Sequence, residues 1–252
     1  MTEPHGRRLN FEGAMNFRDL GGYPAAGGRR TRWRRLFRSD SLADLTQPDL
    51  EQLAYLGLHG LVDFRTETER VLKPNRLPEG AGIRVLEVGF LPAGTLEMLE
   101  EVRAGTISAQ ELERRVVSQY RKFGLDHAGE YRQAVAFATE ADNYPLLIHC
   151  TSGKDRTGFA SALLPLAVGV PRDVVIQDYD LANLYRRDVS HLFGPKTQKD
   201  VISLLLSAQA HYLEAALEEI DRVYGSFEVY LTRTLGVDEI KRARLLELLT
   251  DA

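Results

Sequence analysis

The chain is poor in the residues that would give it a disulfide, a metal centre or a membrane span. It has a single cysteine among its 252 residues, so no internal disulfide can form and an oxidised thiol would have no resolving partner. The six histidines never occur at the spacing of zinc ligands, so we expect no metal and no other cofactor. No apolar run reaches the roughly 18–20 residues that a membrane-spanning helix needs.

The charge balance narrows the class of protein further. A formal net charge of −4 gives no general electrostatic case for binding nucleic acid or an anionic membrane. The opening segment MTEPHGRRLNFEG lacks the apolar core of a signal peptide. We therefore expect a cytoplasmic protein, with export by a non-classical route left open, that forms one domain over residues 1–252. The sequence does not specify the oligomeric state.

Apolar patterning predicts strands that alternate with helices. Strands are expected within residues 31–40, 60–70, 83–90 and 145–150. Helices are expected at 46–60, at about 95–142, and near 157–168, 172–185, 198–223, 226–235 and 237–250. This order favours an α/β domain with a largely parallel sheet. The helical insertion at about 95–142 is longer than a minimal crossover, and it is either a lid over the site or structural padding.

The single cysteine lies between two apolar runs in LLIHCTSGKDRTGFASALL, residues 146–164. We expect a buried strand to end near Ile148 and a helix to begin near Thr157, so that residues 151–156 form a tight loop. The backbone amides of such a loop and the helix N-terminus would together bind an anion of phosphate size. Arg156 adds a planar fork that can bind two phosphate oxygens at once.

Cys150 is expected at the base of this hollow, where the helix N-terminus and nearby cations favour the thiolate. A thiolate below a phosphate monoester predicts in-line attack on phosphorus and a phosphocysteine intermediate, which water then hydrolyses. The Thr157 hydroxyl could donate to the sulfur as it leaves. Gly153 and Gly158 suit positions where the backbone turns or approaches another group closely. A cysteine by itself at a strand end is more often a small buried hydrophobe, so the prediction depends on the whole combination.

The combination of Cys150, five intervening residues and the pair Arg156 and Thr157 resembles the cysteine-dependent protein tyrosine phosphatase superfamily. The string HCTSGKDRTG is similar to the signature HCxxGKDRTG of its bacterial tyrosine/lipid phosphatase family. NFRDLGGY (Asn16–Tyr23) is similar to that family's N-terminal signature. LFRSDSLADLT and LVDFRTETE resemble its next two blocks, in the same order. The resemblance runs from about residue 10 to the C-terminal helices.

The resemblance implies a tyrosine-phosphatase-like fold, with a twisted, mainly parallel sheet flanked by helices. It also implies metal-independent hydrolysis of phosphotyrosine, sometimes of phosphoserine or phosphothreonine, and often of phosphoinositides, so the substrate is expected to be a phosphorylated protein or a phosphoinositide. By position, Cys150 is the nucleophile and Arg156 the phosphate clamp. The phosphate-binding set is Thr151, Ser152, Gly153, Lys154, Asp155, Arg156 and Thr157. Lys154 could meet a second phosphate, as on an inositol ring, or it could be a solvated loop charge.

The general acid is the incomplete part of the pattern. Loss of an alkoxide needs a proton donor, but the loop LPAG at residues 91–94, where the nearest relatives would carry one, has no carboxylate. Asp155 is the best replacement, with a role in bracing the loop as the alternative. The weaker candidates are Asp126 beside His127, followed by Asp178 and Asp180 on a helix face that is expected to be solvated.

Several other polar residues are expected near the loop in supporting roles. They are His149, Arg18, Asp19 and Asp63. Arg65 could act with Asp63 at the end of its strand. For Arg18, Asp19, Asp63 and Arg65, the alternative is a purely structural ion pair. The side chain of His149 should point to the strand face opposite Cys150. Six arginines between residues 29 and 38 either steer anionic substrates or form exposed strand edges. A phosphatase is the predicted function; the alternatives are a phosphate-binding pseudophosphatase and a sulfur transferase.

Overall fold

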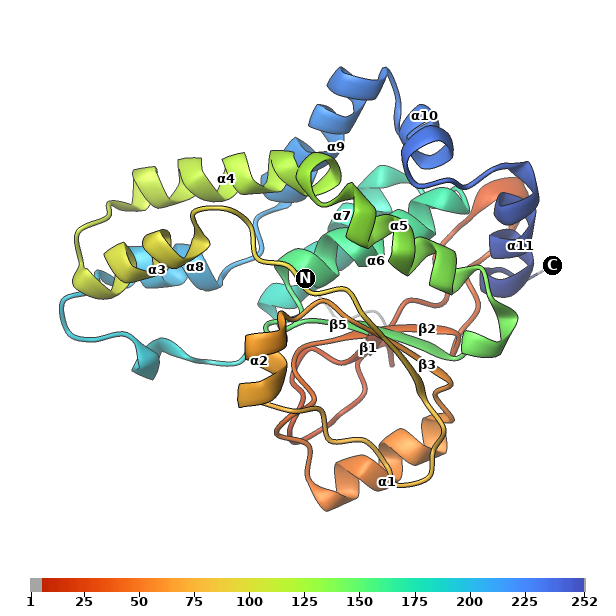
Figure 1. Ribbon diagram of the computed structural model, residues 1–252, viewed down its shortest axis with the longest axis horizontal. Coiled ribbons are helices and arrows are strands. Elements are labelled where there is room, and N and C mark those ends of the chain that lie inside the picture. The colour runs from red at the N-terminus through yellow and green to blue at the C-terminus, as the bar shows by residue number, and fades with distance from the viewer. Residues whose placement is uncertain (1–5, 252) are drawn as a thin grey trace.

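A five-stranded sheet with helices on both faces organises the computed structural model, which describes residues 6–251 (Figure 1). Residues 1–5 lie outside the described residues. They begin the opening segment that we predicted not to be a signal peptide. The strands are β1 (Arg18–Asp19), β2 (Leu36–Ser39), β3 (Gly60–Asp63), β4 (Arg84–Glu87) and β5 (Leu146–His149), in the sheet order β1-β2-β5-β3-β4. Only β1 pairs antiparallel with its neighbour. The predicted α/β fold with a mainly parallel sheet is therefore confirmed.

Helices fill the connections between the strands and the C-terminal part of the chain. The first five are α1 (Gln47–Leu56), α2 (Glu67–Leu72), α3 (Thr95–Ala104), α4 (Ala109–Asp126) and α5 (Ala128–Ala138). The others are α6 (Asp155–Ala167), α7 (Arg172–Asp180), α8 (Lys199–Leu206), α9 (Ala210–Tyr224), α10 (Phe227–Val229) and α11 (Glu239–Leu249). Short 3-10 turns lie at Ala26–Gly28, Ala141–Asn143, Leu181–Asn183 and Ser190–Leu192, and a π-helical turn lies at Tyr230–Thr234.

Alternation along the strands divides the core into two layers. Phe37, Leu61 and Leu147 face α1 and form the smaller apolar cluster. Val62 and Ile148 face the opposite way, into the larger cluster. In Figure 1, α1 covers one face of the sheet alone, while α5, α6 and α7 cover the other. Because every second side chain of a strand points to the same face, residues 148 and 150 share the side of the sheet that α6 covers.

The register of the parallel strands brings three loops to one edge of the sheet. Ser39 and Asp63 both pair with His149, so β2, β3 and β5 end level with one another. The loops that follow begin at Asp40, Phe64 and Cys150. In open α/β sheets, ligands bind at the carboxyl edge of the strands, so the functional site is expected at this edge.

Local signals account for α1, which is confirmed, although it ends at Leu56 and not at residue 60 as predicted. Thr46 is its N-cap and forms a capping box with Asp49, which satisfies amides at the start of the helix that have no partner within it. Pro48 lies in the first turn, where its missing N–H costs nothing. Gly57 ends the helix with φ of 63°, a left-handed conformation that favours glycine.

Several predicted boundaries were wrong. The strand expected within 60–70 ends at Asp63, and α2 begins at Glu67 after a capping box between Thr66 and Glu69. The long helix expected over 198–223 is two helices, α8 and α9. Helix α6 begins at Asp155 rather than near Thr157, so Arg156 lies in the first helical turn and not in the loop.

The helical insertion expected at about 95–142 contains α3, α4 and α5. In Figure 1, α3, α4 and α8 lie side by side beyond the carboxyl edge of the sheet. That residues 1–252 form one domain, and that this insertion acts as a lid, stay predictions. Among the helices of the described residues, none combines the length and the apolar character that crossing a membrane requires.

Candidate active site

The thiol of Cys150 lies at the carboxyl end of β5, directly before the loop that leads into α6. Its residue is 1% exposed, and it belongs to the apolar cluster on the α6 side of the sheet. The next two residues, Thr151 and Ser152, are exposed, whereas Gly153 and Lys154 are buried. The loop therefore rises from the sheet at Cys150 and returns to the interior before α6 begins.

Polar side chains from the N-terminal part of the chain hold the carbonyls of this loop. Asn16 Nδ2 donates to the Gly153 carbonyl at 3.1 Å and lies 3.4 Å from the Ser152 carbonyl. Arg38 Nη2 donates to the same Gly153 oxygen at 2.8 Å. The N–H and the C=O of a planar trans peptide point in opposite directions. When the carbonyl is held on one side of the loop, the N–H of the same peptide points to the other side. The Gly153 peptide is thus fixed, and its other end, the Lys154 N–H, donates to Ser152 Oγ at 3.4 Å.

Gly153 is required at its position for two independent reasons. Its φ is +65°, and a Cβ placed on it would lie 2.4 Å from the Ser39 carbonyl oxygen. No residue with a side chain fits without moving the backbone of β2 or of the loop. Gly158 is also confirmed as a close approach, since a Cβ there would lie 2.8 Å from the ring of Tyr179.

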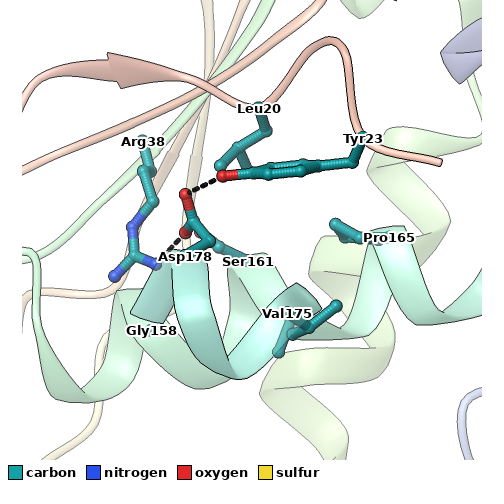
Figure 2. A pocket seen from close by; sticks show the side chains of 9 residues that line it. Leu20, Tyr23, Arg38, Gly158, Ser161, Pro165, Val175 and Asp178 are labelled. Atoms are coloured by element: carbon teal, nitrogen blue, oxygen red, sulfur yellow. Dashed lines mark hydrogen bonds and ion pairs between the residues drawn. The ribbon is translucent and has the colours of Figure 1, made fainter. Parts of the chain in front are cut away.

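A buried charge cluster supports the loop from behind. Asp178 accepts from Arg18 Nε at 3.2 Å, Arg38 Nη1 at 2.9 Å and the Tyr23 hydroxyl at 2.8 Å, and Figure 2 shows the last two contacts. Burial opposes ionisation of Asp178, but the two arginines outweigh it and hold the pKa of this carboxyl well below its usual range. Burial and the neighbouring Arg18 lower the pKa of Arg38 to about 10. Asp178 and Arg38 are therefore both charged at neutral pH.

This cluster corrects two expectations from the sequence. Asp178 is 5% exposed and ion-paired, not on a solvated helix face. Arg38 is 1% exposed, whereas Arg29, Arg30 and Arg34 are exposed as expected. The cause is the strand order: β2 lies between β1 and β5, so Arg38 on its α6-facing side is covered by α6 and α7.

Arg156 is directed by five acceptors, of which the Thr151 hydroxyl oxygen, 3.4 Å from Nη2, is the most distant. Its Nη1 donates to the carbonyls of Phe64 at 2.8 Å and Phe90 at 3.0 Å. Its Nη1 and Nη2 also donate to the two carboxylate oxygens of Glu69, each at 2.8 Å. None of the described residues accepts a hydrogen bond from Nε. Burial disfavours the charge of Arg156, but Glu69 and Cys150 outweigh this effect and raise its pKa above the ordinary value.

Glu69 is a site residue that our sequence analysis did not single out. It lies in the first turn of α2, and its carboxylate also accepts from the Thr151 hydroxyl. Burial raises the pKa of Glu69, but the bonds to Arg156 and Thr151 reverse this and lower it to about 2. The T-x-x-E capping-box pattern at Thr66–Glu69 was the available signal, since it predicts a helix start after β3.

Lys154 and Asp155 lie where the loop joins α6. Lys154 Nζ donates to the carbonyls of Leu205 at 2.7 Å and Ser207 at 3.1 Å, so its charge is directed at the C-terminal end of α8. The Asp155 Oδ1 accepts from the Tyr120 hydroxyl at 2.7 Å and lies 3.4 Å from Lys154 Nζ. The side chain of Asp155 is 35% exposed, so it reaches both the interior and solvent.

His149, Asp63 and Arg65 form a separate polar group on the face of the sheet that α1 covers. His149 Nε2 lies 3.4 Å from Asp63 Oδ2, and Arg65 binds both oxygens of the same carboxylate. Burial opposes the charge on Asp63, but His149 and Arg65 keep its pKa well below the usual range. His149 therefore points away from Cys150, as alternation along the strand predicts, and its Nδ1 lies 3.3 Å from the Cys150 carbonyl oxygen.

Thr157 lies next to the cysteine loop, whereas Asp19 and Asp180 make their contacts elsewhere. Thr157 is fully buried at the start of α6, and its hydroxyl makes no hydrogen bond to the described residues. Asp19 is buried too, but its oxygens accept from the amides of Gly21 and Arg34, so it holds the turn after β1. Asp180 Oδ1 accepts from Asn183 Nδ2 at 2.8 Å. None of these contacts brings Asp19 or Asp180 to the loop.

Asp126 and His127 line a different hollow, of about 300 Å³, together with residues 92–94. The ring of His127 stacks on Phe90 at 3.8 Å between centroids, and burial lowers its pKa below the ordinary value. The structure gives Asp126 no contact with the cysteine loop. The cavity that does adjoin the loop has a volume of about 370 Å³, and Thr151, Ser152, Lys154 and Asp155 line it.

Known proteins provide an independent comparison. Among solved structures, the chain resembles the core catalytic domain of the PP-IP phosphatase SIW14 of S. cerevisiae, at 15% identity and a TM-score of 0.40 over 82% of this chain and 94% of that one. It also resembles TpbA of P. aeruginosa, at 16% identity and a TM-score of 0.32 over 77% and 96%.

Relatives in sequence are much more similar. A protein of Cupriavidus necator named as a tyrosine-protein phosphatase is 35% identical over 91% of this chain and 85% of its own. The triple specificity protein phosphatase PtpB of Mycobacterium tuberculosis is 30% identical over 90% and 93%. The model of the tyrosine phosphatase family matches residues 9–251. The cysteine loop with its arginine, the α/β fold and these matches agree: the chain belongs to the tyrosine phosphatase family and is a phosphoric monoester hydrolase.

Proposed function

We propose that this chain hydrolyses phosphotyrosine in proteins through a phosphocysteine intermediate on Cys150, with phosphoserine, phosphothreonine and phosphoinositides as further substrates. One observation carries the proposal: the cysteine loop, whose Gly153 carbonyl is held by Asn16 and Arg38, joins the Cys150 thiol to the oriented Arg156. The name of the Mycobacterium tuberculosis relative, a triple specificity phosphatase, supports the breadth of substrates.

In the first step, the Cys150 thiolate attacks phosphorus on the side opposite the leaving group. The S–P bond forms while the P–O bond to the leaving group breaks, and Asp155 gives its proton to the departing oxygen. The loop amides and Arg156 bind the equatorial oxygens, whose charge they stabilise best in the transition state. The position of Asp155 supports its role as the general acid, since it lines the cavity together with Thr151 and Ser152.

In the second step, water attacks the phosphocysteine. The Asp155 carboxylate takes a proton from this water as the new P–O bond forms, and the electron pair of the broken S–P bond returns to sulfur. The Thr157 hydroxyl, which is buried and has no hydrogen-bond partner among residues 6–251, is available to stabilise the thiolate that leaves. Inorganic phosphate is then released, and Cys150 and Asp155 return to their starting states.

The cavity supports an aromatic phosphate as the main substrate. Its volume of about 370 Å³ falls within the range of small-molecule sites, and Leu192, Leu205 and Leu206 give it an apolar wall. Such a wall suits the ring of a tyrosine. For a second phosphate, as on an inositol ring, the exposed cations of the lining are Arg186 and Lys73. Lys154 is already bonded to two carbonyls, and Lys73 lies 3.6 Å from Asp44, so Arg186 is the better candidate.

Hydrolysis of para-nitrophenyl phosphate tests the proposal, since this ester has a good leaving group and reacts even with a weak acid. We expect wild type to turn it over, and Cys150→Ser to lose turnover while it still binds inorganic phosphate in calorimetry. Turnover by Cys150→Ser would refute the covalent mechanism. Phosphate binding by a wild type that hydrolyses no phosphate ester would instead identify the alternative, a pseudophosphatase.

A further inference from the structure

The hydroxyl of Tyr120 connects the helical insertion to the start of α6. Tyr120 lies on α4 and is 1% exposed, yet its hydroxyl donates to Asp155 Oδ1 at 2.7 Å. Lys154 Nζ lies 3.4 Å from the same oxygen. No described residue donates a hydrogen bond to Asp155 Oδ2. The two carboxylate oxygens are thus in different positions: one is held by protein groups, and the other is left for a ligand or water.

A second phenol fixes the direction of this hydrogen bond. The Tyr179 hydroxyl oxygen lies 2.6 Å from that of Tyr120. A phenol has one proton to donate, and Tyr120 directs its proton to Asp155, so Tyr179 must donate to Tyr120. Burial raises the pKa of both phenols well above 10, and both keep their protons at neutral pH. The chain Tyr179 to Tyr120 to Asp155 therefore orients groups and does not itself transfer protons.

The surroundings of Tyr120 are otherwise aromatic. Its ring packs against Phe123 at 4.7 Å and Tyr212 at 5.5 Å between centroids. The hydroxyl of Tyr212, which is also fully buried, makes no hydrogen bond to the described residues. The same aromatic cluster thus contains one hydroxyl that is bonded to the site and one that is not, and this provides a matched pair of positions.

We propose that Tyr120, held by Tyr179, is a positioning residue that occupies Asp155 Oδ1, so that Oδ2 delivers the proton to the leaving group. This inference rests on the proposed function, in which Asp155 is the general acid. As the Oδ2–H bond breaks and the proton joins the leaving oxygen, negative charge develops on the carboxylate. The hydrogen bond from Tyr120 strengthens with that charge, so it stabilises the transition state more than the ground state.

Leaving-group dependence tests this role. We expect Tyr120→Phe to lower kcat on phenyl phosphate and on a phosphoserine peptide by roughly 10- to 100-fold, the effect of one hydrogen bond to a charged group. On para-nitrophenyl phosphate, which needs little help from an acid, the loss should be under about threefold. Tyr212→Phe should leave all three rates unchanged. Tyr179→Phe, which keeps the contact between Tyr120 and Asp155, should show the same selectivity with a smaller loss.

A double-mutant cycle separates positioning from a merely structural effect. In an Asp155→Asn background, Tyr120→Phe should cause no further loss on phenyl phosphate, because Tyr120 acts only through that carboxyl. An equal loss on all three esters, or the same loss with and without Asp155, would overturn the inference even if the proposed function holds. If Asp155→Asn itself shows no leaving-group selectivity, the acid assignment fails and Tyr120 loses its role with it.

Discussion

Arg156 and Glu69, 87 residues apart in sequence, face each other through two parallel hydrogen bonds of 2.8 Å. A bidentate pair of this kind fixes the plane of the guanidinium as well as its position. The carbonyls of Phe64 and Phe90 fix the same group from another side. Arg156, the proposed phosphate clamp, is thus oriented by protein groups alone, which would lower the entropic cost of binding a phosphate.

This pair should give the protein an acid-sensitive component of stability. The folded pKa of Glu69 is about 2, against an ordinary value of 4.5. The contribution is therefore fully present above pH 4.5 and is lost as the pH falls through 2. At 1.36 kcal/mol for each pKa unit it amounts to about 3 kcal/mol at neutral pH. Urea unfolding of wild type and Glu69→Gln should show this difference at pH 7 and a much smaller one near pH 2. A difference independent of pH would contradict the assignment.

Asp178→Asn should be strongly destabilising. It removes the negative charge that compensates Arg18 and Arg38, both of which are buried, and breaking a buried ion pair typically costs about 3–5 kcal/mol. The matched control is Asp221→Asn, because Asp221 pairs with Arg172 at a surface where both side chains are more than a third exposed. That variant should lose at most about 1 kcal/mol. Equal losses in the two variants, measured by denaturant unfolding, would show that burial of the cluster is unimportant.

Gly153→Ala should inactivate the enzyme. The new Cβ would meet the backbone of Ser39 and Asp40, so the loop must shift, and a displacement of about 1 Å can cost about 100-fold in rate. Gly129→Ala, in α5, is the control, because no atom lies within 4 Å of its Cβ position. It should leave kcat unchanged, because the new methyl group meets no neighbouring atom. Normal kcat in Gly153→Ala would mean that the loop tolerates another conformation.

Lys154→Ala should loosen α8 from the loop. The two bonds from Nζ to the carbonyls of Leu205 and Ser207 are lost, so amide hydrogen exchange should accelerate around residues 199–209. The value of kcat/KM should fall by a similar factor on a phosphotyrosine peptide and on a soluble phosphoinositide bisphosphate. Lys199→Ala, an exposed position on the same helix, should change neither. A loss confined to the bisphosphate would show instead that Lys154 meets the second phosphate.

The sequence predicts features of this fold that depend on neighbours along the chain. The cap at Thr46 and the sharp transition from β5 to α6 were predicted because their signals are local. The strand predicted over 60–70 was too long for a local reason too. Its apolar residues led us to extend it past Thr66, where a capping box begins α2. With α2 unrecognised, Glu69 could not be placed beside Arg156.

Features that depend on strand order could not be predicted in this way. Arg38 differs little in type from the exposed arginines before it, and only the position of β2 between β1 and β5 buries it. Its partner Asp178 lies 140 residues further on. Likewise, nothing in the pattern of α4 distinguishes Tyr120, which meets Asp155 across 35 residues, from the aromatic residues that only pack.

The polar contacts behind the cysteine loop also bear on how the enzyme is made. Asn16 and Arg38 leave the ribosome long before the loop that they hold, and Asp178, which pairs with Arg38 and Arg18, follows later still. A nascent chain that stops between residues 158 and 177 contains the thiol and its arginine but leaves the guanidinium groups of Arg18 and Arg38 without their carboxylate. Prematurely terminated products should therefore carry the whole signature motif and yet show no phosphatase activity.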